Sequence, residues 1–119
     1  MRNWTAIRER YLRDPLPIRL GGLVANLARI KSFSDHPDHR EVIESLLDES
    51  KFFIEWTAPE AELKIAARLV ELQIQLARWQ QRWPDIWNDA SQRFKVADQS
   101  HMWSQDILEF SGLLRSSAH

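Results

Sequence analysis

Residues 59–82 constrain the fold more than any other stretch, because nearly every position outside one polar strip is apolar. The strip follows helical spacing and comprises Lys64, Arg68, Glu71, Gln75, Arg78 and Arg82. Outside the strip, Glu60 and Glu62 lie near the start of the segment, and three further glutamines interrupt the apolar remainder. A helix on the surface of a simple bundle needs a much narrower apolar face than this segment offers. We therefore expect a long helix that is either central in the fold or covered by a second subunit.

The rest of the chain also places apolar residues at helical spacing, and its 119 residues include only three glycines and five prolines. No segment shows the alternation that is typical of a strand. We predict a single all-α domain, an up-down bundle of four main helices with a short extra N-terminal helix. The predicted elements are an N-terminal helix or arm at 1–15 and main helices at 17–33, 37–56, 59–82 and about 85–115.

Prolines and capping residues set these predicted boundaries. Pro59 occupies a favoured first position of a helix. The last helix has two possible starts, at Pro84 or near Asp89, and we favour the later one because Asp89 and Gln92 have the spacing of a capping box. Residues 83–88 are then a connection between antiparallel helices.

The stretch RWQQRWPDIWNDA at residues 78–90 contains three of the six tryptophans, at positions 79, 83 and 87, which span nine residues. Pro84 lacks a backbone donor and disfavours helical geometry at the residue before it, so this ladder is expected to turn a corner. Two interpretations are open: the indoles pack over the end of the bundle, or they contact a partner, since tryptophan is enriched at interface hot spots. The interface candidates are Trp79, Trp83, Ile86 and Trp87.

Gly21 and Gly22 fall inside a predicted helix, where each costs about 1 kcal/mol relative to alanine. One explanation is a close approach of two helices over a face of small residues. The other is a ligand cleft between the first and third main helices, with a polar side chain orienting the ligand. The candidates for this packing or cleft are Gly21, Gly22, Ala25, Asn26 and His101.

The net charge of −1 argues against a general nucleic-acid binder, so a nucleic-acid partner is not expected. The charges are nevertheless segregated: residues 1–31 carry a net +5, residues 32–62 a net −7, and the remainder +1. Either neighbouring helices complement one another, or one face meets a charged partner.

The absence of cysteine excludes disulfides and thiolate metal sites. No apolar stretch approaches the length of a membrane span or of a secretory h-region, so we expect a cytoplasmic protein without a membrane span.

Catalytic motifs are missing from the sequence. The segment SFSDHPDHREVIE contains His36 and His39, but its pattern is that of a helix start, with a metal site as the alternative. No pair of Glu-x-x-His motifs, nucleophile–base pair or glycine-rich phosphate loop occurs. His101 interrupts an apolar stripe and is interpreted as a core or interface histidine, or as a pH-responsive group or general base. We predict no catalytic residue, no metal and no cofactor.

The segment LGGLVANLARIKSF at 20–33 resembles short uncharacterised helical proteins of cyanobacteria, a resemblance that implies no activity. We expect a non-catalytic interaction protein, an accessory or scaffold subunit that pairs with itself as a homodimer or with another protein. The alternatives are a bundle that binds a small molecule or cofactor and, third, a helical factor associated with nucleic acid.

Overall fold

The computed structural model describes residues 3–113, and all regular structure in that range is helical, which confirms the all-α prediction. In chain order the α-helices are α1 (Trp4–Leu12), α2 (Leu16–Phe33), α3 (Arg40–Thr57), α4 (Leu63–Gln81), α5 (Trp83–Trp87) and α6 (Ala90–Phe110). Two 3-10 turns, η1 (Pro37–His39) and η2 (Ala58–Glu60), stand before and after α3. No helix among the described residues is both long and apolar enough to cross a membrane.

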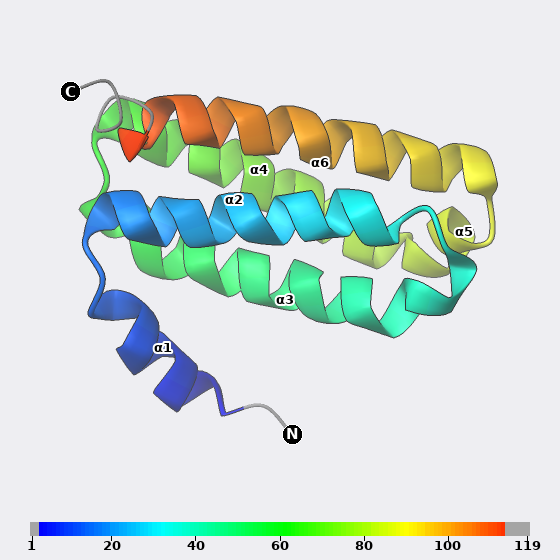
Figure 1. Cartoon of the computed structure of the whole chain (residues 1–119), viewed down its shortest axis with the longest axis horizontal. Coiled ribbons are helices and arrows are strands. Elements are labelled where there is room, and N and C mark those ends of the chain that lie inside the picture. The colour runs from blue at the N-terminus through cyan, green and yellow to red at the C-terminus, as the bar shows by residue number, and fades with distance from the viewer. Residues whose placement is uncertain (1–2, 114–119) are drawn as a thin grey trace.

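The four long helices lie side by side, with α2 and α4 running in one direction and α3 and α6 in the other (Figure 1). The most extensive packing joins α2 to α6, the next joins α2 to α3, and α4 packs mainly on α3. The central helix is therefore α2, whereas α4 lies at the edge of the fold. Helices α4 and α6 are not a closely packed pair, which leaves a seam between them.

The core is built from apolar residues that recur at three- and four-residue spacing on each long helix, so that one face of each is buried. On α2 these residues are Leu20, Leu23, Leu27 and Ile30, each at most 1% exposed. The other long helices contribute Ile43, Leu47, Ile54, Leu69, Leu72, Leu76 and Ile107, all fully buried.

The predicted helix at 59–82 begins later than Pro59, and this boundary was wrong. Pro59 lies in η2, and the backbone then becomes extended at Ala61 (ψ 155°) and at Glu62 (ψ 146°). These two residues break the helical path, so α4 starts at Leu63. In the same way residues 37–39 form the separate turn η1, and α3 starts at Arg40.

The predicted connection at 83–88 contains a short helix, α5, which has Pro84 in its first turn. It is separated from α4 by Arg82, whose ψ of 13° departs from helical geometry. The following helix, α6, begins at Ala90, where the Asp89 carboxylate accepts a hydrogen bond from the Ser91 amide at 2.9 Å. The Asp89 side chain thus caps the amide two residues later, at Ser91, whereas the predicted capping box would pair Asp89 with Gln92, three residues later. Helix α6 ends at Phe110, and residues 114–115 of the predicted last helix lie outside the described residues.

A buried polar cluster fixes α1 against the start of α2 and the end of α3. The Tyr11 hydroxyl donates to the carbonyl of Arg19 at 2.9 Å, and the Arg19 guanidinium donates to the carboxylate of Glu60 at 2.6 Å. Arg19 is only 8% exposed, and its Nε also donates to the carbonyl of Asp14. The arginine thus joins the α1–α2 linker, α2 and η2.

Candidate functional site

The polar strip of α4 faces α6 across the seam. Near the start of α4, the Arg68 guanidinium donates to the Asp106 carboxylate at 2.9 Å and lies 4.5 Å from the centre of the Trp103 ring. Arg68 is also paired with Glu71 on its own helix. These contacts bridge the seam at that end, beside a second cavity of about 380 Å³ that Arg68 and Asp106 line with Glu109 and Phe110.

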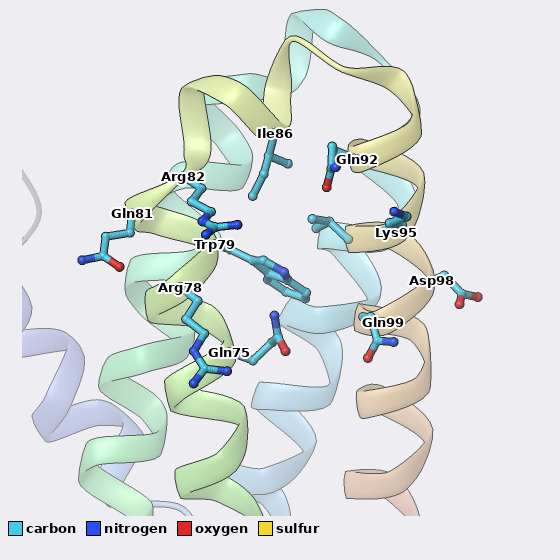
Figure 2. Close-up of a pocket in the computed structure, with 11 residues that line it drawn as sticks. Gln75, Arg78, Trp79, Gln81, Arg82, Ile86, Gln92, Lys95, Asp98 and Gln99 are labelled. Carbon is cyan, nitrogen blue, oxygen red and sulfur yellow. The ribbon is translucent and has the colours of Figure 1, made fainter.

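Toward the other end the seam opens into a cavity of about 750 Å³, which we call the seam cleft. Figure 2 shows Arg78 and Arg82 on the α4 wall, Gln92, Lys95 and Gln99 on the α6 wall, and Ile86 of α5 at the closed end. The complete lining is Gln75, Arg78, Trp79, Gln81, Arg82, Ile86, Gln92, Lys95, Val96, Asp98 and Gln99.

The floor of the seam cleft is apolar. The Trp79 indole extends from α4 into the space between α4 and α6 (Figure 2), beside Ile86 and Val96. These three side chains are 7%, 6% and 2% exposed, so they also belong to the core. The Trp79 indole N–H donates to no described residue, and it is not among the buried polar atoms that lack a partner. It therefore reaches the cleft.

The walls of the seam cleft carry positive charge. Arg78, Arg82 and Lys95 line it, and none of the three side chains has an ion pair or hydrogen bond with another described residue. Asp98 is the one carboxylate of the lining, and its side chain is directed away from α4 (Figure 2). The cleft is thus locally cationic on a chain whose net charge is −1.

The predicted tryptophan cluster divides into two parts at Arg82. Trp83 and Trp87 are 4% and 5% exposed, their ring centres lie 5.6 Å apart, and the Trp87 indole donates to the carbonyl of Pro37 at 3.0 Å. These two residues seal the corner of the fold together with Ile86. Because they are buried within the chain, they offer little surface to a partner, and Trp79 alone of the four interface candidates presents a free donor to a cavity.

The predicted ligand cleft around the two α2 glycines is not formed, because its space is filled. A Cβ on Gly21 would lie 3.0 Å from Leu113, and one on Gly22 would lie 3.7 Å from the rings of Tyr11 and Phe53. Asn26 is 1% exposed and donates to Glu49 of α3. Ala25 belongs to the small-residue face of α2. That helix packs most extensively on α6, as the close-packing interpretation expects.

The three histidines singled out in the sequence, His36, His39 and His101, do not lie together at one site with the glycines of α2. His101 is half-buried and lines a separate cavity of about 320 Å³ between α2 and α6, with Lys31 and Asp35. His36 caps η1 by accepting a hydrogen bond from the Asp38 amide, and its ring centre lies 5.2 Å from that of His39. Within residues 3–113 no group of three or more metal-ligating side chains converges.

A second surface feature lies on the face of α4 opposite its core face. Leu63, Val70 and Ile74 are 83%, 45% and 49% exposed, and Ala67 and Ala77 on the same face are also exposed. The positions 63, 67, 70, 74 and 77 follow the spacing of one helical face, about half a turn from Leu69, Leu72 and Leu76 of the core. We call these five residues the outer stripe of α4.

Two groups of the described chain have clearly shifted pKa values, and both belong to the polar cluster that holds α1. Burial raises the pKa of the Tyr11 hydroxyl to about 12, partly opposed by its hydrogen bond with Thr57. The hydrogen bond and the positive charge of Arg19 lower the pKa of Glu60. The two groups stabilise the end of the fold where α2 begins and α3 ends.

No protein family model, curated protein or solved structure matches this chain at a significant level.

Sequence reasoning missed the seam cleft, although a signal for it was present. Gln75 and Arg78 on α4 and Arg82 directly after it have the spacing i, i+3, i+7, and Gln92, Lys95 and Gln99 on α6 repeat it. Each set occupies one helical face. Two such faces on successive antiparallel helices indicate a polar wall on each side of one seam.

Proposed function

We propose that the protein is a helical interaction module that pairs with a second copy of itself through the outer stripe of α4. The observation that carries this proposal is the presence of two apolar faces on one edge helix. The inner face enters the core with Leu72 fully buried, whereas the outer face leaves Val70 and Ile74 about half exposed. A second subunit over the outer stripe removes that apolar surface from water, which is the main favourable term in association.

The order of side-chain sizes along the stripe favours a second copy as the occupant. Leu63 lies seven residues before Val70 and Ala77 seven residues after it, while Ala67 and Ile74 lie three before and four after. In two antiparallel helices related by a twofold axis near Val70, Leu63 is therefore level with Ala77 of the other copy and Ile74 nearly level with Ala67, while the two copies of Val70 meet at the axis. A twofold interface requires such self-complementarity, because the same patch serves both subunits.

The size of the stripe indicates a weak dimer. The five residues span about 21 Å of helix, at about 1.5 Å per residue. A stable interface usually contains about 20–30 residues on each side, which is several times more. We expect a dissociation constant on the order of tens of micromolar.

The role that fits these features is that of an accessory or scaffold subunit without catalytic activity, built as an up-down bundle of the four long helices. The lack of cysteine is compatible with a reducing compartment, and we propose the cytoplasm as its location.

Sedimentation velocity over protein concentrations from about 5 to about 300 µM tests the dimer. We expect the wild-type protein to change from monomer to dimer over this range. Val70→Glu places a charge in the centre of the stripe and should keep the protein monomeric throughout.

The matched control is Val42→Glu, because Val42 on α3 is 42% exposed and lies outside the stripe. This variant should dimerise as the wild type does. A wild-type protein that stays monomeric at the highest concentration, or equal loss of dimer in both variants, overturns the proposal.

A further inference from the structure

We propose that the seam cleft binds a small anion that carries a planar ring, of the size and chemistry of a nucleoside monophosphate. This inference goes beyond the proposed dimer, because the seam cleft lies on the polar strip of α4 rather than on the outer stripe. It rests on the charge, the floor and the size of the cleft.

The charge arrangement calls for an anion. Arg78, Arg82 and Lys95 line one cavity and form no ion pair with a described carboxylate, and Asp98, the one carboxylate of the lining, is directed away from α4 (Figure 2). A bound phosphate or carboxylate group accepts charge-assisted hydrogen bonds from guanidinium and ammonium donors, and arginine binds such groups in a bidentate manner. Arg78 lies in the last turn of α4 and Arg82 directly follows that helix, and both side chains line the cleft.

The apolar floor of the cleft favours a ligand that carries a ring over a bare inorganic ion. Trp79, Ile86 and Val96 form the apolar base of the cleft, with 7%, 6% and 2% of their surfaces exposed, and the Trp79 indole N–H is a free donor at its edge. Inorganic phosphate gains nothing from such a surface, whereas an aromatic ring buries apolar area against it.

The size and the rim agree with that ligand class. The volume of about 750 Å³ lies within the range of roughly 300–1,000 Å³ that is usual for small-molecule sites. Gln75, Gln92 and Gln99 add amide groups, each with both a donor and an acceptor, which is the combination that reads the edge of a heteroaromatic base.

The neighbouring cavity beside His101 lacks this combination. It measures about 320 Å³, and its single cation, Lys31, is balanced by Asp35 and Asp98. Within the described chain, the seam cleft alone of these two joins uncompensated positive charge to an aromatic floor.

Isothermal titration calorimetry with the four ribonucleoside monophosphates, the matching nucleosides and inorganic phosphate tests the proposal at about 50 mM salt, where screening is modest. We expect at least one monophosphate to bind with a dissociation constant on the order of 100 µM. Its nucleoside and inorganic phosphate should each bind at least about tenfold more weakly, because each lacks one of the two contacts.

Two pairs of variants locate the site. Arg78→Gln and Lys95→Gln should each weaken binding by about tenfold, the usual effect of losing one hydrogen bond to a charged group. Their controls are Arg10→Gln and Lys64→Gln, which remove exposed cations outside the cleft and should leave the affinity unchanged. Circular dichroism verifies that every variant is folded.

Several results would overturn the proposal. These are the failure of all four monophosphates to bind at millimolar concentration, equal binding by inorganic phosphate alone, and unchanged affinity in both Arg78→Gln and Lys95→Gln. The variant Val70→Glu separates this proposal from the dimer, since it should abolish self-association and still bind the nucleotide with wild-type affinity.

Discussion

The hydroxyl oxygen of Tyr11 lies 2.9 Å from the hydroxyl oxygen of Thr57, and this contact joins α1 to the end of α3. Tyrosine has one hydroxyl proton, which Tyr11 donates to the carbonyl of Arg19, so its oxygen accepts the hydrogen bond from Thr57. The Tyr11 ring also stacks on Phe53, with ring centres 4.1 Å apart. One buried side chain therefore makes the polar and the apolar contacts that hold α1 in place.

The stability of the protein should fall at alkaline pH because of Tyr11. Its pKa is about 12 in the folded protein and about 10 in the unfolded chain, so the unfolded chain loses this proton first as the pH rises. The contribution of Tyr11 is complete below pH 10 and is lost between about pH 10 and 12, to a limit of about 3 kcal/mol.

The measurement is simple because Tyr11 is the only tyrosine of the chain. Absorbance at the phenolate band should show ionisation near pH 12 in the native protein and near pH 10 in denaturant. Urea denaturation of Tyr11→Phe should lack the part of the alkaline loss that the tyrosine causes. A native phenolate that titrates near pH 10 would contradict the assignment.

Truncation of a side chain should destabilise the protein far more on the inner face of α4 than on the outer face. Leu72 points into the core and is 0% exposed to solvent, so Leu72→Ala should lower the free energy of unfolding by about 2–5 kcal/mol. Ile74 is two residues away and 49% exposed, so Ile74→Ala should change it by less than about 0.5 kcal/mol. Urea denaturation at a concentration where the protein is monomeric measures both, and equal losses would place the core face of α4 wrongly.

Replacing Gly22 and Gly112 by alanine should have opposite effects on stability, because only Gly112 has a backbone conformation that favours glycine. A Cβ on Gly22 has ordinary contact distances of 3.7 Å, so Gly22→Ala should raise the melting temperature and stabilise by about 0.5–1 kcal/mol through helix propensity. Gly112 has a φ of +90°, which side chains rarely adopt, so Gly112→Ala should destabilise by about 1 kcal/mol. Calorimetric scans of the two variants should move in opposite directions, and a destabilised Gly22→Ala would indicate tighter packing than the geometry shows.

The extents of the helices were largely predictable, because helical spacing of apolar residues reports the buried face directly. The start of α4 was not, since Pro59 is a favourable first residue and the residues after it, Ala61 and Glu62, have no intrinsic aversion to a helix. Tertiary packing decides that boundary. The break at Arg82 was expected from Pro84, but the short helix that follows it was not.

The sequence carried the two polar faces that line the seam cleft but not the existence or size of the cavity between them, because these depend on the separation of α4 and α6. Trp79, Trp83 and Trp87 are evenly spaced along the chain, yet of the three only Trp79 reaches the seam cleft with a free indole N–H. The change of direction at Arg82 causes that difference. The polar strip of α4 was recognised, but its neighbour across the seam was identified only by the three-dimensional arrangement.

The dominance of the contact between α2 and α6 has a consequence for the order of folding during synthesis. Nearly half of the chain, residues 34–89, separates the end of α2 from the start of α6, so the ribosome completes α6 long after it completes α2. Until then the side of α2 that α6 covers stays in water, and the nascent chain can assemble only α1 to α5. The native core is therefore completed only when α6 emerges and packs on α2.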